Sequence, residues 1–126
     1  MSIERAVYGK NHDSHANPDR IITTVINGDI EGFASEHVRV ARFERETDAG
    51  NHWREYSELY GIIGKARFFL EDIDSKERRE YTMETGDRLF VPERVALRIH
   101  AEAGTVIVTC SQKADRNSGT HEYNVA

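Results

Sequence analysis

One short segment, residues 50–64 (GNHWREYSELYGIIG), holds the side chains best suited to chemistry. The groups of interest are His52, Arg54, Tyr56, Glu58 and Tyr60. An imidazole can accept or donate a proton near neutral pH, a phenol can donate one, and a guanidinium can pair with a carboxylate or an anionic ligand. The segment therefore indicates a site for ligand binding or for acid–base chemistry.

The spacing of these groups predicts that they face one interior. Side chains of a β-strand alternate between its two faces, so His52 and Arg54 share one face. Glu58, Tyr60 and Ile62 share one face of the following strand for the same reason. We expect both faces to point into the same barrel.

The elements that must position these groups have β character. Helical periodicity is almost absent, while short segments rich in Val, Ile, Thr, Phe and Tyr recur along the chain. Strands are predicted at 20–27, 37–44, 58–63, 65–72, 79–84, 88–92, 96–101 and 105–111. Turn-forming residues predict turns at 27–29, 48–51, 73–77, 85–87 and 102–104. This pattern predicts an all-β antiparallel sandwich or barrel.

The 126 residues are enough for one domain. Residues 8–19 are polar and without periodicity, so we expect an N-terminal arm or loop over 1–19. The barrel is expected over 20–111. Residues 112–126 are again polar, and we expect a C-terminal tail that frays or packs on a partner chain.

Composition excludes several functions. With 17 basic and 22 acidic residues and a net charge of -5, the chain is not expected to bind nucleic acid. A secretory leader and a run of ~18 apolar residues are both missing, so no membrane association is expected. The single cysteine, Cys110, cannot form an internal disulfide and is interpreted as a packing residue. We expect a soluble cytoplasmic protein.

Two glycine-bounded segments resemble the two motifs of the cupin superfamily of jelly-roll barrels. The first motif matches at Gly50, His52, Glu58 and Gly64, and the second at Gly86, Asp87 and Pro92. The resemblance covers about residues 36–110, and RIITTVINGDI at 20–30 is similar to the entry strand of cupins that act on nucleotide sugars. It implies a double-stranded β-helix barrel with a small-molecule ligand in its mouth. It also implies a homodimer, formed through an edge strand, with the N-terminal arm free to cross over.

Metal-dependent cupins supply three histidines and one glutamate to a divalent ion. Carried over by position, His52 and Glu58 match, whereas Arg54 and Leu97 stand where the other two histidines would be. A guanidinium has no lone pair to donate and leucine has no donor atom, so two ligands remain. We therefore expect neither a metal nor another cofactor.

One alternative keeps a metal through His52, Glu58 and His100. Leu97 and Ile99 share one face of their strand, so His100 should point outwards if Leu97 points inwards. A one-residue bulge after Pro92 would reverse this assignment.

The resemblance also extends to metal-free cupins, the deoxysugar 3,5-epimerases and 3,4-ketoisomerases. It implies that His52 is the base, that Tyr60 or Tyr56 is the acid, and that Arg54 steers a phosphate or carboxylate. Ketoisomerases place a second histidine where this chain has Arg54, and the aspartate partner of the epimerases is not identified here. The expected ligand site also includes Glu58 and an apolar wall formed by Phe68, Leu97 and Ile99.

Three functions thus stay open. The first is binding of a small anionic or carbohydrate-like molecule, with isomerase or epimerase chemistry on a sugar. The second is a metal-dependent oxygenase or lyase with an imperfect ligand set. The third is a non-catalytic binding or structural cupin, in which Arg54 and Glu58 form a structural ion pair.

Overall fold

The computed structural model describes residues 2–10, 14–25, 30, 32–113 and 119–125. A short 3₁₀ helix, η1 (Ser2–Arg5), precedes the strands. The strands are β1 (Val7–Gly9), β2 (Ser14–Ala16), β3 (Ile21–Thr23), β4 (His37–Arg42), β5 (Thr47–Arg54), β6 (Glu58–Ile63), β7 (Lys65–Asp72), β8 (Arg78–Glu84), β9 (Arg88–Val91), β10 (Val95–Ala101), β11 (Val106–Ser111) and β12 (Thr120–Glu122). No helix in this part of the chain is long and apolar enough to cross a membrane.

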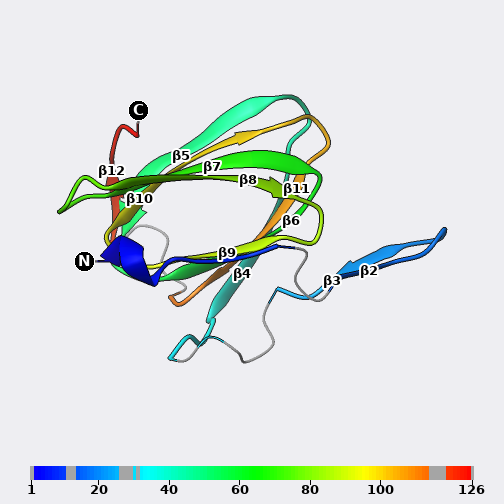
Figure 1. The fold of residues 1–126 in the computed structure, drawn as a ribbon, viewed down its shortest axis with the longest axis horizontal. Coiled ribbons are helices and arrows are strands. Elements are labelled where there is room, and N and C mark those ends of the chain that lie inside the picture. The colour runs from blue at the N-terminus through cyan, green and yellow to red at the C-terminus, as the bar shows by residue number, and fades with distance from the viewer. Residues whose placement is uncertain (1, 11–13, 26–29, 31, 114–118, 126) are drawn as a thin grey trace.

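Two five-stranded antiparallel sheets face each other and form the barrel (Figure 1). One sheet has the order β1-β9-β6-β11-β4 and the other the order β12-β5-β10-β7-β8. The predicted all-β fold is confirmed. Apolar side chains from both inner faces fill the space between the sheets, among them Tyr60, Ile62, Phe68, Leu70, Met83, Leu89, Leu97, Ile99 and Ile107.

Strands from both chain ends join these sheets, outside the range 20–111 expected for the barrel. β1 pairs with β9, and Tyr8 of β1 stacks on Tyr81 of β8 across the sandwich, with 5.2 Å between ring centroids. At the other end of the chain, β12 pairs with β5. The expected polar tail thus contains an edge strand, and Val125 just beyond it is buried.

The N-terminal helix closes one end of the barrel. Ile3 is fully buried, and its backbone N–H donates to the Asp72 carboxylate at 3.0 Å. Asp72 also accepts backbone hydrogen bonds from Asp74 and Ser75. Burial acts to raise the pKa of Asp72, but these backbone donors outweigh it and lower the pKa.

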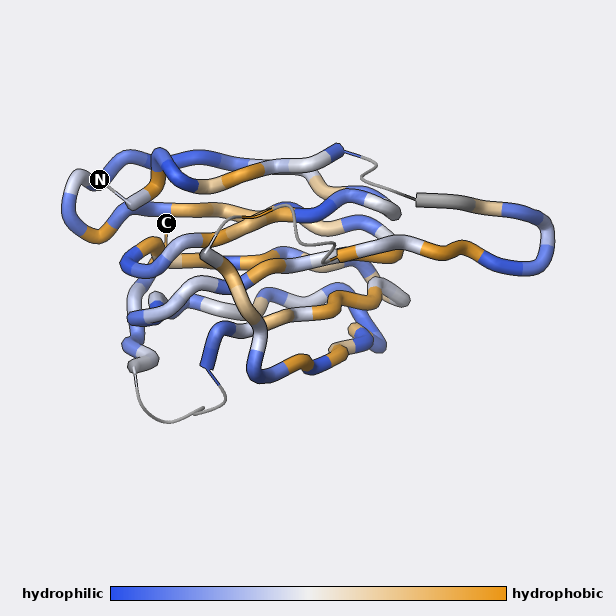
Figure 2. Tube along the Cα trace, turned by 90° about the horizontal axis from the view of Figure 1, so that it is seen from below, coloured by the Kyte–Doolittle hydropathy of each residue, from blue (hydrophilic) through white to orange (hydrophobic). Residues whose placement is uncertain are grey.

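The strand predicted over 20–27 is shorter than expected. β3 covers Ile21–Thr23 and pairs with β2 in a separate hairpin, which extends beyond the two sheets (Figures 1 and 2). The turn expected at 27–29 lies outside the described residues. Val25 then lies over Gly61 of β6, where an added β-carbon would lie only 2.3 Å from the Val25 side chain. Gly61 therefore lets Val25 pack directly on the outer face of the sheet that contains β6.

The turn predicted at 48–51 is wrong, because these residues lie inside β5. The register with β10 shows why: His52 is opposite Leu97 and Gly50 is opposite Arg98, so Asn51 is an extra, bulged residue. Gly50 (φ 93°) and Asn51 (φ 58°) both adopt the positive φ values that β-bulges require. Glycine and asparagine favour turns for the same reason, so the sequence pattern was ambiguous.

Substituting Gly50 tests this bulge. In Gly50→Ala the new β-carbon would lie 2.7 Å from the Leu97 carbonyl oxygen, in addition to the strain of a positive φ. Gly104→Ala is the matched control, since Gly104 has φ 82° but nothing within 4 Å. We expect Gly50→Ala to lower the free energy of unfolding by ~1–3 kcal/mol more than Gly104→Ala, measured by urea denaturation. Equal losses would show that β5 tolerates a side chain at the bulge.

Candidate functional site

A small cavity inside the barrel collects the chemically competent residues. It is lined by His52, Arg54, Tyr56, Glu58, Tyr60, Val91, Pro92, Val95 and Leu97. Its accessible volume is about 10 Å³, which is about the space of one water molecule.

Strand register explains how these residues meet. Leu97 and Ile99 of β10 are buried in the core, and residues directly opposite each other on paired strands project to the same face. His52 is opposite Leu97, so it faces the interior, and Arg54 follows two residues later. The bulge at Asn51 does not alter this placement, because His52 and Arg54 both lie after it; the extra residue shifts only their alternation relative to the first half of β5.

Glu58 of β6 is the centre of the hydrogen-bond network in the cavity. Its side chain is only 4% exposed. One carboxylate oxygen accepts from Arg54 Nη1 and from the Tyr60 hydroxyl, the latter at 2.7 Å. The other accepts from Ser111 Oγ and from Arg39 Nη2, the latter at 3.3 Å. A buried carboxylate is thus satisfied by two cations and two hydroxyls.

These contacts set the charges in the cavity. Burial acts to raise the pKa of Glu58, but Arg54, Ser111, Tyr60 and Arg39 together lower it, so Glu58 is ionised at neutral pH. Burial, followed by the Glu58 charge, raises the pKa of Tyr60 well above its usual value. Burial acts to lower the pKa of Arg54, yet the neighbouring Tyr60 and Glu58 raise it. Arg54 and Glu58 therefore form a buried ion pair.

His52 is a neutral imidazole at physiological pH. Burial lowers its pKa to about 4, and the positive charge of Arg54 acts in the same direction. Its Nε2 atom is buried and has no hydrogen-bond partner. A buried nitrogen without a partner is costly, and such atoms occur where a ligand or water completes the site. His52 thus offers an unprotonated nitrogen for a proton transfer.

The structure brings six of the eight predicted site residues to this cavity: His52, Arg54, Tyr56, Glu58, Tyr60 and Leu97. The other two lie deeper. Phe68 is fully buried and packs edge-on against Tyr60, with 5.6 Å between ring centroids. Ile99 belongs to the same apolar core and does not line the cavity. Phe68 and Ile99 support the site from behind instead of forming its wall.

Sequence reasoning missed several contributors. Val91, Pro92 and Val95 form the apolar wall together with Leu97. Ser111 and Arg39 reach Glu58 from β11 and β4, and Thr120 Oγ1 of β12 accepts from Arg54 Nε at 3.2 Å. In the sequence Arg39 alternates with Val38 and Val40, and this alternation was the one signal that could have placed Arg39 on the other face of its strand. The contacts of Ser111 and Thr120 depend on long-range pairing that local spacing does not reveal.

The alternative in which His100 joins His52 and Glu58 as a metal ligand is wrong. The register between β10 and β7 is regular from Val95 to Ala101, and the bulge lies in β5, so His100 stays on the outer face. There its Nδ1 lies 2.9 Å from Asp48 and its Nε2 lies 2.8 Å from Glu46. The hydrogen bond with Asp48, then that with Glu46, raises the pKa of His100. Two further histidines, His12 and His15 of the segment NHDSH, have side chains outside the described residues.

The donor set in the cavity does not fit a divalent metal ion. Arg54 places a cation directly on the Glu58 carboxylate, and Leu97 has no donor atom. Over the described residues, no group of three or more His, Cys, Asp or Glu side chains could hold an ion. First-row metals need more imidazole or carboxylate donors than His52 and Glu58 provide.

Restoring the missing donors should create a metal site. Arg54 and Leu97 line the same cavity as His52 and Glu58, so Arg54→His combined with Leu97→His gives three imidazoles and one carboxylate. We expect the double variant to bind one cobalt(II) per chain, measured by visible absorption and elemental analysis. Each single variant is the control and should bind far more weakly. A double variant that binds no better than wild type would disprove the positional match.

No family model matches the chain, and no curated protein matches it in sequence. Solved structures do match. A dTDP sugar isomerase from Desulfovibrio desulfuricans is 12% identical, with TM-score 0.82 over 97% of this chain and 85% of that one. A dTDP-4-dehydrorhamnose 3,5-epimerase from Bacillus anthracis, with TDP and pyrophosphate bound, is 13% identical, with TM-score 0.80 over 97% and 80%.

A third match is a variant 3,4-ketoisomerase from Thermoanaerobacterium thermosaccharolyticum in complex with TDP-4-keto-6-deoxyglucose. It is 12% identical, with TM-score 0.74 over 91% of this chain and 85% of that one. At such identities the likeness establishes the fold, not the reaction. Together with the two facing sheets and the motif residues gathered between them, these matches show that the chain is a cupin-fold protein, a single jelly-roll barrel.

Proposed function

We propose that this protein binds a nucleotide-linked keto sugar at the mouth of its barrel and catalyses metal-free proton transfer on the sugar. The observation that carries the proposal is the neutral His52, whose unpartnered Nε2 lies in a cavity beside a buried arginine–carboxylate pair. Structural neighbours that isomerise or epimerise dTDP sugars support the choice of ligand class.

The first chemical step would be proton abstraction next to a carbonyl group. The C–H electron pair forms the enolate, and the proton moves to His52 Nε2. The resulting imidazolium is opposed by Arg54 but stabilised by Glu58, the two charges that already act on its pKa. Where the carbon that lost its proton carries a hydroxyl group, delivering a proton to the former carbonyl carbon, with the hydroxyl proton passing to the former carbonyl oxygen, exchanges the ketone and the alcohol. Delivering a proton to the opposite face of the same carbon instead inverts that centre.

Tyr56 is the better candidate for the acid. The Tyr60 hydroxyl already donates to Glu58, and losing its proton would place a phenolate against that carboxylate, as the raised pKa of Tyr60 reflects. Tyr56 lines the same cavity from the loop between β5 and β6. We therefore assign Tyr56 to proton return and Tyr60 to positioning Glu58.

A phosphate-bearing ligand also needs a cation that solvent can reach. Arg39 on β4 fits this need, because its side chain is 37% exposed while one nitrogen contacts Glu58. Arg54, at 14% exposed, is committed to Glu58 and Thr120. We assign anion binding to Arg39, with Arg54 holding the cavity together.

Incubation with TDP-4-keto-6-deoxyglucose in D₂O tests the proposal. Proton abstraction should incorporate deuterium at C3, at C5 or at both, and NMR of the sugar then distinguishes ketoisomerase from epimerase chemistry. The absence of both exchange and binding would refute the proposal. Metal analysis of the purified protein gives a second test, since stoichiometric Fe, Mn, Ni or Zn would contradict a metal-free mechanism.

One observation favours a non-catalytic alternative. The Arg54–Glu58 pair fills the position of a metal, and the cavity has room for about one water molecule. A binding or structural cupin would need nothing more. Binding of the nucleotide sugar without deuterium exchange would support this second function.

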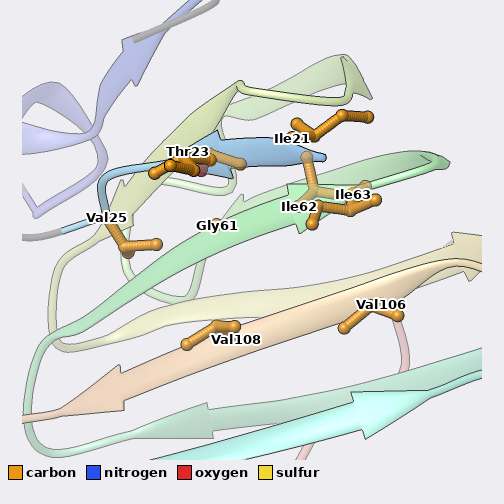
Figure 3. Close-up of a pocket in the computed structure, with 9 residues that line it drawn as sticks. Ile21, Thr23, Val25, Gly61, Ile62, Ile63, Val106 and Val108 are labelled. Carbon is orange, nitrogen blue, oxygen red and sulfur yellow. The ribbon is translucent and has the colours of Figure 1, made fainter. Parts of the chain in front are cut away.

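We further propose that the protein is a homodimer formed through β4. This strand ends the order of its sheet, and Val38 and Val40 on its outer face are 58% and 66% exposed. The same sheet face carries an apolar groove of about 290 Å³ between β3 and strands β6 and β11 (Figure 3). A second copy can pair with β4 about a two-fold axis, covering both edges and both valines.

Val40→Glu tests this interface. We expect it to convert a dimer into a monomer in analytical ultracentrifugation, because the two-fold axis would bring two buried charges together. Val7→Glu is the matched control, since Val7 is an exposed valine of β1, at the opposite edge of the same sheet. A wild-type monomer, or a dimer unaffected by Val40→Glu, would refute the assignment.

We also expect the protein to act in the cytoplasm. Cys110 is buried with Leu59 and Phe90, and burial raises the pKa of its thiol, as suits a packing residue. Localisation of a tagged chain by fractionation would test this expectation.

A further inference from the structure

A second, larger hollow adjoins His52 beneath the C-terminal segment. We call it the C-terminal groove; it is lined by Gly50, Asn51, His52, Thr120, Glu122, Tyr123 and Asn124. Its accessible volume is about 420 Å³, against about 10 Å³ for the inner cavity. His52 lines both hollows, so the candidate base stands where they meet.

The pairing of β12 with β5 directs two side chains towards this base. Glu122 is directly opposite His52, and Thr120 is directly opposite Arg54. Opposed residues of an antiparallel pair project to the same face. The hydrogen bond from Arg54 Nε to Thr120 Oγ1 shows this alignment. The C-terminal segment therefore adds a hydroxyl and a carboxylate to the face that carries the candidate base.

The bulge in β5 anchors this segment. Tyr123 N–H donates to the Asn51 carbonyl at 3.0 Å, and Val125 N–H donates to Asn51 Oδ1 at 3.2 Å. Just before the start of β12, the Gly119 carbonyl accepts a hydrogen bond from Glu55 N–H at 2.8 Å. Hydrogen bonds of backbone groups thus hold the C-terminal segment, which forms one wall of the groove, in place.

The chemistry of the lining selects a class of ligand. Thr120, Glu122, Asn51 and Asn124 offer a hydroxyl, a carboxylate and two amides. Carboxylates accept hydrogen bonds from hydroxyl groups, and amides both donate and accept. The lining residues include neither lysine nor arginine, which a phosphate would need. A neutral polyhydroxylated ring suits this groove and a phosphate does not.

We propose that the C-terminal groove is a subsite for the hydroxyl groups of a sugar ring, with Glu122 and Thr120 as its binding residues. The subsite rests on the proposed function for its link to a nucleotide sugar. The ring would lie in the groove with its reactive carbon at His52, and the diphosphate would extend towards Arg39. The groove supplies the space that the inner cavity lacks.

Trp53 provides a built-in reporter. It is the single tryptophan of the chain. Its ring stacks on His121 of β12, with 4.1 Å between ring centroids, and Arg94 lies 5.4 Å from its centre. Occupancy of the groove that shifts β12 should change the Trp53 emission without any introduced label.

The test compares TDP-glucose with TDP by titration calorimetry and Trp53 emission. Wild type should bind TDP-glucose more tightly than TDP. Glu122→Gln and Thr120→Val should each lower the affinity for TDP-glucose about tenfold and leave TDP unchanged, which corresponds to one lost hydrogen bond of ~1.4 kcal/mol. Glu80→Gln and Thr82→Val on β8, at the opposite edge of the same sheet, are the matched controls and should change neither affinity.

The possible results separate the two proposals. The subsite would be overturned if the groove variants lost equal affinity for TDP and TDP-glucose, or if neither variant lost affinity. Binding of the nucleotides would still support the proposed ligand class. If neither nucleotide binds, NMR spectra of the backbone amides at a high concentration of glucose test the subsite by itself. Shifts confined to Thr120, Glu122 and Asn124 would uphold the subsite and reject the nucleotide ligand, and unchanged spectra would reject both.

Discussion

Replacing His52 by alanine is expected to lower the rate of deuterium incorporation into a TDP-4-keto sugar by about 10²- to 10⁴-fold. The reason is that His52 Nε2 is the buried nitrogen without a partner, in a cavity where Glu58 and Arg54 already neutralise each other. The measurement is NMR of the sugar in D₂O. His100→Ala is the matched control, because His100 lies on the outer face and pairs with Asp48 and Glu46.

The pH dependence follows from the lowered pKa of His52. With a pKa of about 4 in the free protein, His52 is unprotonated throughout the range above pH 5. The acidic limb of the profile of kcat/KM against pH should therefore stay level down to about pH 5 and fall below about pH 4. A loss of rate already at pH 6.5 that His52→Ala abolishes would contradict this assignment.

His52 should also contribute to stability in a defined pH window. Its pKa in the folded chain is about 4, below the ordinary value of 6.5, so the unfolded chain binds a proton first as the pH falls. The free energy of unfolding should decrease between about pH 6.5 and pH 4. His52→Ala should reduce that decrease, which urea denaturation at several pH values can measure without any substrate.

The second large effect concerns stability. Arg54→Met should lower the free energy of unfolding by ~3–5 kcal/mol, because it leaves the Glu58 carboxylate, 4% exposed, without its main cation. Arg39 remains 3.3 Å away and moderates the loss. Arg42→Met is the control, since Arg42 and Glu44 form a pair in which both side chains are mostly exposed. There we expect less than ~1 kcal/mol.

A second substitution separates charge from packing. In Arg54→Met combined with Glu58→Gln, no unpaired carboxylate remains, so we expect much of the stability to return. Glu58 has a lowered pKa in the folded chain, so its stabilisation is present above its ordinary pKa and is lost as the pH falls through the lowered value. Wild type should therefore lose stability in acid more steeply than the double variant. A double variant as unstable as Arg54→Met would show that lost packing, not charge, is the cause.

The sequence predicted most of the inner cavity because two local rules coincide there. Alternation along strands placed His52 with Arg54 and Glu58 with Tyr60, and the fixed offset from Pro92 identified Leu97. The assumption of regular alternation failed in β5, where Asn51 is extra. It did not affect the assignment of His52 and Arg54, which both lie after the bulge.

What the sequence could not predict depends on pairing between distant segments. Thr120 and Arg54 are far apart in the chain, and three polar residues of an edge strand carry no periodic signal. Ile3 packs on the barrel from a stretch that reads as loop, because it is a single apolar residue between Ser2 and Glu4. Tyr8 ends a run of only three apolar residues, which is too short to show a period. Such contacts are determined by tertiary packing, which overrides weak local preference.

The extra residue of β5 has a consequence for how this chain can vary. Removing Asn51 would restore an ordinary strand and keep His52 and Arg54 pointing inwards, whereas removing Trp53 would turn one of them outwards. Asn51 also accepts the hydrogen bonds that the backbone N–H groups of Tyr123 and Val125 donate. A one-codon deletion there would spare the geometry of the inner cavity and remove two hydrogen bonds that hold the carboxyl-terminal segment, so the two halves of the site can diverge separately.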